Sequence, residues 1–236
     1  MIIMAQKGRG KGRRRPEEKE PFNIEAWQPK TELGKRVKSR EISSVDEIFE
    51  MGKPILEHEI VDALVPTLKD DVLQISQTTR MTDSGRKFGY RAVVLVGDEN
   101  GHVGVGTGKA AEAKPAIESA LKYAKRNIMR IPRGCGSWEC GCGTRHSLPI
   151  TLKGRNGSVS VTIKPAPRGI GIAASEVVKK VLRMAGVKDA WTFSRGRTRN
   201  VYNTAMAALS ALDMMNNMRF KGDWETRLAG KGEENA

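Results

Sequence analysis

The chain has 236 residues, enough for one or two domains, and a formal net charge of +14. A basic excess of this size is typical of proteins that bind a phosphate backbone. No apolar run approaches the roughly 18 to 20 residues of a membrane-spanning helix, and the apolar start Met1–Met4 is too short for a signal peptide. The three cysteines are odd in number and crowded together, so they predict no disulfide framework, and we expect a cytoplasmic protein.

Residues 1–40 are expected to form a basic, largely extended arm. Lys7–Arg15 has six basic residues in nine and no apolar or acidic side chain, so it cannot bury a core and is expected to be disordered alone. A solvated tail is one interpretation. A polybasic arm that becomes ordered on RNA fits so basic a chain better.

Residues 41–132 are expected to form a first α+β domain. Ser44 and Glu47 have capping-box spacing, which predicts a short helix. Apolar patterning then predicts a helix, a strand, a polar basic loop, a strand, a turn, a short strand running into a glycine-rich segment, and a helix: Ile55–Val65, Leu73–Thr79, Arg80–Lys87, Phe88–Val96, Asp98–Gly101, His102–Val105 and Lys114–Asn127. This order is the layout of double-stranded-RNA-binding-like domains.

The glycine-rich segment Gly104–Lys109 invites comparison with a nucleotide-binding loop. A P-loop requires Ser or Thr after the lysine and a glycine where this chain has Val103, but Ala110 follows Lys109. The dinucleotide pattern fails as well. Close backbone packing or a phosphate contact explains the glycines better.

Residues 133–148 are expected to form a Gly- and Cys-rich linker between domains. Cys135, Cys140, Cys142 and His146 are the donor set of a closed structural Cys3His zinc site. The spacing is unusual, and a loop with free thiols is an equally open interpretation. All four positions would be filled by protein ligands, so a catalytic zinc is not expected.

Residues 149–216 are expected to form a second small α+β domain, followed by a tail at 217–236. Patterning predicts a hairpin turning at Asn156–Gly157, a helix capped by Ser175, a short strand, a basic loop and an alanine-rich helix: Leu152–Lys164, Glu176–Ala185, Ala190–Ser194, Arg195–Asn200 and Val201–Met215. In the first of these helices Lys179, Lys180 and Arg183 lie opposite the apolar arc, with no acidic partner on their face.

Basic residues at loops and helix ends are the candidate RNA contacts, because guanidinium and ammonium groups there can reach phosphates. The predicted set is Arg13, Arg14, Arg15, Arg86, Lys87, Arg91, Lys109, Arg133, Arg145, Lys153, Arg168, Lys179, Lys180, Arg183, Arg195, Arg197 and Arg199. No catalytic residues are expected, since no constellation of nucleophile, acid and base is evident.

Three segments together resemble a known family. Arg86–Leu121 is similar to the first domain of the fifth protein of the small ribosomal subunit, and Gly154–Ile172 and Val181–Leu212 are similar to its second domain. The resemblance is strongest to archaeal- and eukaryotic-type members with long N-terminal extensions, and it covers roughly residues 68–215. It implies a structural, non-enzymatic constituent of the cytoplasmic ribosome that needs no cofactor for function and takes no small-molecule substrate.

The resemblance also implies partners: small-subunit ribosomal RNA, neighbouring proteins including the fourth, and messenger RNA near the path by which it enters, where the protein supports translational accuracy. The basic loop Arg80–Lys87 would reach toward the neck of the subunit. A free-standing double-stranded-RNA-binding regulator is the alternative function, and it would not need the second domain. A zinc-dependent RNA-modifying enzyme is disfavoured, since the His-x-Glu element of a deaminase is absent.

Overall fold

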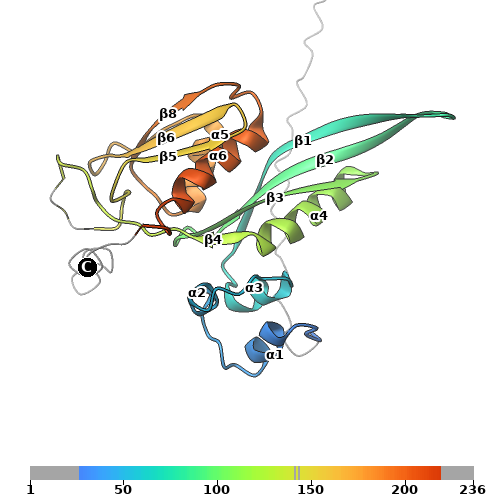
Figure 1. The fold of residues 1–236 in the computed structure, drawn as a ribbon, viewed down its shortest axis with the longest axis horizontal. Coiled ribbons are helices and arrows are strands. Elements are labelled where there is room, and N and C mark those ends of the chain that lie inside the picture. Colours follow the sequence, from blue (N-terminus) through green and yellow to red (C-terminus); the bar gives the residue numbers. More distant parts are fainter. Residues whose placement is uncertain (1–26, 141, 143, 219–236) are drawn as a thin grey trace, which may run out of the picture.

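The computed structural model describes residues 27–140, 142 and 144–218, and within them two four-stranded sheets (Figure 1). The first sheet is antiparallel, in the order β1-β2-β3-β4: Lys69–Thr82, Gly85–Gly97, His102–Ala110 and Ile128–Arg130. The second has the order β5-β6-β8-β7: Leu152–Asn156, Val159–Pro165, Ala190–Arg195 and Ile172–Ala173, with β7 parallel to β8. The expected two-domain α+β class is confirmed.

Six helices are described, and three of them cover the sheets. Helix α4 packs on β2 and β3, while α5 and α6 pack on the second sheet and on each other: Ala113–Arg126, Glu176–Met184 and Val201–Asp213. The other three helices lie beside the first sheet and precede it in the chain: α1, α2 and α3, at Glu32–Lys38, Val45–Glu50 and Glu59–Leu64. As expected, Ser44 caps α2 by accepting a hydrogen bond from the Glu47 N–H.

The extended arm expected over residues 1–40 is wrong for its described part, residues 27–40. Thr31 caps α1 by accepting a hydrogen bond from the Gly34 N–H, and Leu33 and Val37 are buried with Trp27. These apolar side chains pack with those of α2 and α3, which stabilises the helix despite its basic composition. The polybasic segment Lys7–Arg15 lies outside the described residues.

The expected loop at Arg80–Lys87 is instead mostly a strand ladder. Arg80 pairs with Lys87 and Met81 with Arg86, so only Asp83 and Ser84 form the turn. Strand β3 ends at Ala110, which pairs with Tyr90 of β2. Between Tyr90 and the turn, the β1–β2 hairpin therefore has no third strand beside it, and it projects past the rest of the sheet (Figure 1).

The glycine-rich segment expected after a short strand is also a strand, because β3 continues to Ala110. A Cβ added at Gly106 would lie less than 3.0 Å from backbone atoms of Ala120 and Ala124 in α4, and Gly108 is equally close to the same helix. The glycines therefore let an alanine-faced helix lie directly on the strand. Close backbone packing was one of the two interpretations left open because neither nucleotide-binding motif is complete. It is the role that these glycines have in the structure.

A single apolar cluster, here called the shared core, joins the two domains. Val93 and Leu95 of β2 and Val103 and Val105 of β3 belong to it, together with side chains of the second domain: Leu152, Val159, Val161, Ile163, Val178, Val181, Leu182, Ala207, Ala208, Ala211 and Leu212. The other face of β2 carries Ala92, Val94 and Val96 against α4. The second domain therefore buries the face of the first sheet that lies opposite α4.

Replacing Gly106 with Ala should lower the free energy of unfolding by about 1 to 3 kcal/mol, because the new methyl group would force α4 away from β3. Gly89→Ala is the matched control in the neighbouring strand β2. There the nearest atom to an added Cβ, the Ala110 carbonyl oxygen, is 3.4 Å away, so the change should stay within about 0.5 kcal/mol. Chemical denaturation of both variants measures the difference, and equal stabilities would contradict the packing role of Gly106.

Candidate metal centre and nucleic-acid interface

The loop between the domains brings the four predicted metal ligands together. One ligand atom from each of Cys135, Cys140, Cys142 and His146 lies within 4.8 Å of the others. A backbone bridge in which Gly134 and Ser147 exchange two hydrogen bonds of 2.9 Å holds the two ends of this loop side by side. The His146 Nε2 faces the cysteines, at 3.2 Å from the Cys135 Sγ and 3.8 Å from the Cys140 Sγ.

Asp189 fixes the orientation of His146 from the second domain. Its Oδ2 lies 2.7 Å from the His146 Nδ1, and both side chains are buried. The other carboxylate oxygen accepts hydrogen bonds from the N–H groups of Gly169 and Gly171. A carboxylate on the far nitrogen of a ligating histidine selects the tautomer that leaves Nε2 free for a metal. Asp189 also ties the cluster to the turn that carries Arg168.

The thiols of the cluster lie in unequal environments. Burial raises the pKa of the Cys135 thiol to about 12. Burial acts in the same direction on Cys142, but hydrogen bonds from the Thr144 side chain and backbone outweigh it and lower the pKa of that thiol to about 6. A cation held by these sulfurs would favour the thiolate at every position, as metal ligation requires.

The donor chemistry and the arrangement fit a metal ion. Three sulfurs and an imidazole nitrogen are the ligands of closed structural zinc sites, and all four come from one short segment. The described residues offer no further His, Cys, Asp or Glu group to this cluster. The arrangement can therefore stabilise a loop but leaves no ligand position for a substrate.

Most of the predicted RNA contacts that fall in the described residues are exposed cations. They lie at the hairpin tip, at the end of β3, on the outer side of the second sheet, and in the loops and helix of the second domain: Arg86, Lys87, Lys109, Arg145, Lys153, Arg168, Arg183, Arg195, Arg197 and Arg199. Lys179 is half-buried. Arg197 and Arg199 directly precede α6, whose N-cap is Asn200. Arg13, Arg14 and Arg15 lie outside the described residues.

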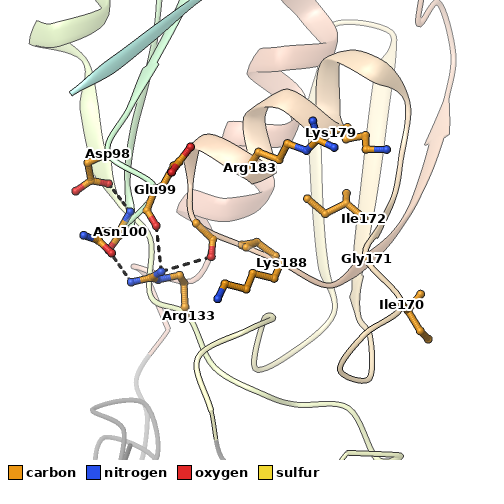
Figure 2. Close-up of a pocket in the computed structure, with 12 residues that line it drawn as sticks. Asp98, Glu99, Asn100, Arg133, Ile170, Gly171, Ile172, Lys179, Arg183 and Lys188 are labelled. Carbon is orange, nitrogen blue, oxygen red and sulfur yellow. Dashed lines mark hydrogen bonds between the residues drawn. The ribbon is translucent and has the colours of Figure 1, made fainter. Parts of the chain in front are cut away.

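An interdomain groove of about 810 Å³ gathers several of these cations (Figure 2). Lys179 and Arg183 of α5 form one side, the segment Ile170–Ile172 forms another, and Arg133 and Lys188 lie toward the first domain. Two carboxylates also border the groove, but Asp98 is hydrogen-bonded to His102 and Glu99 is paired with Lys69. The cations of α5 are thus presented where an anion can approach them.

Three predicted RNA contacts have structural partners instead. Arg133 donates hydrogen bonds to the carbonyl oxygens of Glu99, Asn100 and Gly186, and so joins the β2–β3 turn to the end of α5. The Arg91 guanidinium lies 5.2 Å from the centre of the Tyr202 ring in α6. The absence of an acidic partner on the α5 face, expected from the sequence, is wrong for one residue, because Lys180 pairs with Asp71 of β1 at 3.0 Å.

Three basic residues that belong to these surfaces were not predicted from the sequence. Lys188 lines the groove from the turn after α5. Arg155 and Lys164 lie on the outer side of the second sheet, beside the predicted contacts Lys153 and Arg195. The alternation of polar and apolar residues in Leu152–Lys164 could have identified Arg155 and Lys164, because it separates the polar side of that hairpin from its buried side.

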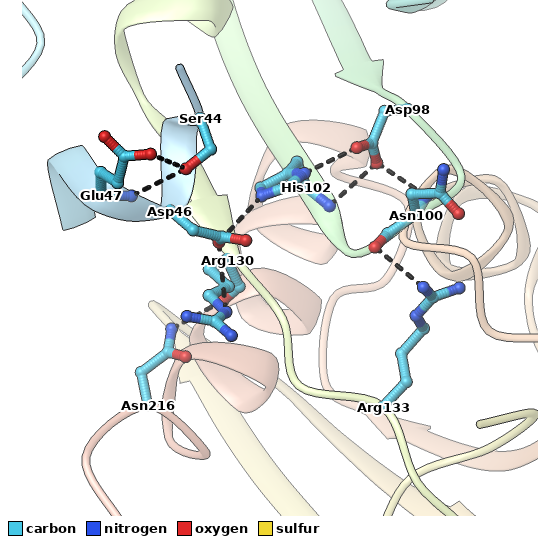
Figure 3. A network of polar contacts seen from close by, with 9 residues as sticks. All are labelled: Ser44, Asp46, Glu47, Asp98, Asn100, His102, Arg130, Arg133 and Asn216. Carbon is cyan, nitrogen blue, oxygen red and sulfur yellow. Dashed lines mark hydrogen bonds and ion pairs between the residues drawn. The ribbon is translucent and has the colours of Figure 1, made fainter. Parts of the chain in front are cut away.

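A polar junction links the N-terminal helices, the first sheet and the second domain (Figure 3). His102 lies between two carboxylates, with Nδ1 2.6 Å from Asp98 and Nε2 3.3 Å from Asp46 of α2. Asp46 also pairs with Arg130, whose carbonyl oxygen accepts a hydrogen bond from Asn216. Burial acts to lower the pKa of His102, but the two carboxylates outweigh it and raise that pKa above its ordinary value. No carboxylate partner for this histidine was evident in the sequence.

Among the described residues, no helix has the length and apolarity that crossing a membrane requires.

Comparison with known proteins gives matches over most of the chain. The family descriptions are "Ribosomal protein S5, N-terminal domain" for residues 68–132 and "Ribosomal protein S5, C-terminal domain" for residues 154–227. The small ribosomal subunit protein uS5 of Methanococcus maripaludis is 52% identical over 202 residues, which cover 86% of this chain and 90% of that protein. The uS5 proteins of Aeropyrum pernix and Picrophilus torridus are 52% and 53% identical, covering 87% and 80% of this chain and 95% and 85% of their own lengths.

His102→Gln should destabilise the chain more at low pH than at high pH. Because the pKa of His102 is raised on folding, its stabilisation is fully present below the unfolded value of about 6.5 and is lost as pH rises through the folded pKa. Loss of the charged hydrogen bonds should cost about 1.5 to 3 kcal/mol at pH about 5.5, and less at pH about 9.

His58→Gln is the control for that comparison, because the pKa of His58 is lowered, chiefly by burial. Its removal should not weaken the chain selectively at low pH. Denaturation curves at the two pH values measure both variants. A penalty for His102→Gln that does not change with pH would contradict a charged His102 in the junction.

Proposed function

Because this chain belongs to the ribosomal protein S5 family of the small ribosomal subunit, we propose that it binds small-subunit ribosomal RNA through its exposed cations. Its family consists of ribosomal structural proteins and not of enzymes, so the non-enzymatic role and the cytoplasmic ribosome predicted from the sequence are confirmed. The family matches on both domains do not favour a free-standing double-stranded-RNA-binding regulator, which would not need the second domain.

The observation that carries the RNA-binding proposal is the placement of accessible cations on one rigid body. Lys179 and Arg183 border a groove whose acidic residues are already paired, and Arg168, Arg197 and Arg199 stand exposed on loops of the same domain. The shared core fixes the domain that carries these groups against the first sheet, from which the hairpin with Arg86 and Lys87 projects. Such an array neutralises phosphates where RNA helices pack closely, and each contact fixes the orientation of the protein on the RNA.

Within the subunit, the proposed neighbours are those that the family resemblance implies. The projecting β1–β2 hairpin would reach toward the neck, and the fourth small-subunit protein and the incoming messenger RNA would lie nearby. A rigid protein at that place would support translational accuracy by limiting the movements that the surrounding RNA can make.

We also propose that Cys135, Cys140, Cys142 and His146 hold one structural zinc ion. The convergent donor atoms and the Asp189 carboxylate behind His146 support this proposal. The ion would supply no chemistry beyond cross-linking the loop. Its purpose is local, because the shared core already fixes the two domains relative to each other. The zinc would instead hold the Gly-rich loop, and through Asp189 the turn at Gly169–Gly171, in one conformation.

Changing Lys179 and Arg183 together to Gln should reduce the dependence of small-subunit RNA binding on salt. The slope of log K against log salt should fall by about 0.9 for each phosphate that the variant no longer neutralises. Lys114→Gln with Lys122→Gln is the control, because it removes the same charge from exposed positions of α4. Fluorescence anisotropy at several salt concentrations measures the slopes, and identical slopes for the two double variants would contradict a phosphate contact in the groove.

Purified protein should contain about one equivalent of zinc with sulfur distances near 2.3 Å by X-ray absorption, and Cys140→Ser should release it. Glu139→Gln, an exposed change in the same loop, should keep the metal. Asp189→Asn retains an oxygen for Gly169 and Gly171 but removes the acceptor facing His146, so it should weaken zinc binding about 10- to 100-fold. Metal-free protein with all three thiols alkylated freely in assembled subunits would contradict the site.

A further inference from the structure

The second sheet has one exposed side, opposite α6, which we call the outer face. The strand register arranges its side chains in three rows across β5, β6 and β8: Arg155, Ser160 and Arg195, then Lys153, Thr162 and Phe193, then Lys164 and Trp191. The alternate positions, among them Leu152, Val161 and Ile163, point inward and are buried in the shared core. This sheet is therefore apolar on one side and carries aromatic, hydroxyl and basic groups on the other.

Two aromatic rings stand next to each other on this face. Trp191 and Phe193 are alternate residues of β8, so they are about 7 Å apart along the strand. The side chain of Phe193 is 57% exposed, Trp191 is partly exposed, and neither belongs to an apolar cluster of the described residues. The Lys164 ammonium lies 5.2 Å from the centre of the Phe193 ring. The exposed Phe193 ring thus has a cation over one of its faces and Trp191 next to it along the strand.

The charge of the outer face has a single sign. Its four charged residues are Lys153, Arg155, Lys164 and Arg195, all exposed. Residues 149–200 contain only two acidic side chains. Of these, Glu176 begins α5 and Asp189 is buried against His146, so neither joins the three rows. An anionic partner can approach the rings without meeting a carboxylate from this domain.

We propose that the outer face binds a single-stranded segment of RNA, whose unpaired bases stack on Trp191 and Phe193 while Lys153, Arg155, Lys164 and Arg195 contact its phosphates. Exposed sheets that combine aromatic rings with basic residues recognise unpaired RNA in this way, since every base presents a face for stacking. A duplex keeps its bases inside and cannot use the rings. A protein partner would have to bring both acidic and apolar groups, whereas an RNA strand carries phosphates and bases in every nucleotide.

This proposal rests on RNA binding as the function of the chain but concerns a different surface from the interdomain groove. The groove has cations without exposed aromatic rings and suits phosphates of folded helices. The outer face adds stacking, which depends weakly on salt, to a set of phosphate contacts that depend strongly on it. The two contributions can therefore be separated by measuring binding at several salt concentrations.

The test measures binding of the full chain to a fluorescein-labelled oligouridine of about 10 nucleotides and to a duplex of the same length. Phe193→Leu keeps an apolar side chain but removes the ring, and it should weaken oligouridine binding about 5- to 100-fold with little change in salt slope. Phe193→Tyr keeps the ring and should retain affinity. Arg155→Gln with Arg195→Gln should instead lower the salt slope by about 0.7 for each phosphate that is no longer neutralised.

Tyr123→Ala is the matched control, because Tyr123 is also an exposed aromatic residue with a cation beside it, Arg126, but lies on α4. It should leave oligouridine binding unchanged. Equal affinities of the wild type and Phe193→Leu, or an equal loss of duplex binding in that variant, would overturn the proposal. RNA binding through the groove is tested separately by the Lys179 and Arg183 double variant, so it can stand if the outer face fails.

Discussion

The second half of strand β2, residues 92–97, is buried on both of its faces, and this packing holds the two domains together. Ala92, Val94 and Val96 face α4, while Val93 and Leu95 face the second domain. Exposing either face would cost roughly 25 cal/mol for each Å² of apolar surface, so the two domains are held together by the same effect that folds each of them. At the contact, Gly97 lies so close to Met184 of α5 that an added Cβ would collide with it.

The same packing solution is used in both domains. Gly106 and Gly108 of β3 lie under the alanines of α4, and Gly154 of β5 lies under Ala207 and Ala211 of α6. Strand glycines that face helix alanines bring the helix axis close to the sheet, and this close contact leaves the helix little freedom to slide along the strand. The backbone hydrogen bond from the Glu99 N–H to the Met184 carbonyl, and the three carbonyls that Arg133 contacts, complete the contact between domains. The result is a rigid body that displays cations on several sides.

The elements of this fold could be predicted well from local patterns, because alternation and helical spacing are local signals. The capping box at Ser44, the hairpin of β5 and β6 and the helix that begins after Ser175 all follow from neighbouring residues. The continuation of the predicted strand through Gly106–Ala110 was not predicted, since glycine has low strand propensity and only the approach of α4 explains it. Likewise, α1 is short, and its burial depends on the distant α2 and α3.

The candidate sites, like the fold, could be predicted where the evidence is local in the sequence and not where it depends on distant residues. The four residues of the candidate metal site could be identified because they are close in the sequence, whereas Asp189 is 43 residues from His146 and carried no signal there. Most cations were identified from their charge alone, but charge does not reveal partners, and so Arg133, Arg91 and Lys180 were assigned to RNA although each has a contact within the protein. The sequence alone did not indicate a binding surface at Trp191 and Phe193. The strand register indicates one, because it places basic residues around them on the outer face.

A density map of the small ribosomal subunit containing this protein would show whether one rigid two-domain body holds cations against ribosomal RNA. We expect residues 92–96 of β2 to be covered on one face by α4 and on the other by the second domain, and Lys179 and Arg183 to lie within hydrogen-bonding distance of RNA phosphates. A map in which the second domain is detached from β2 and β3, or in which the interdomain groove faces open solvent, would contradict this expectation.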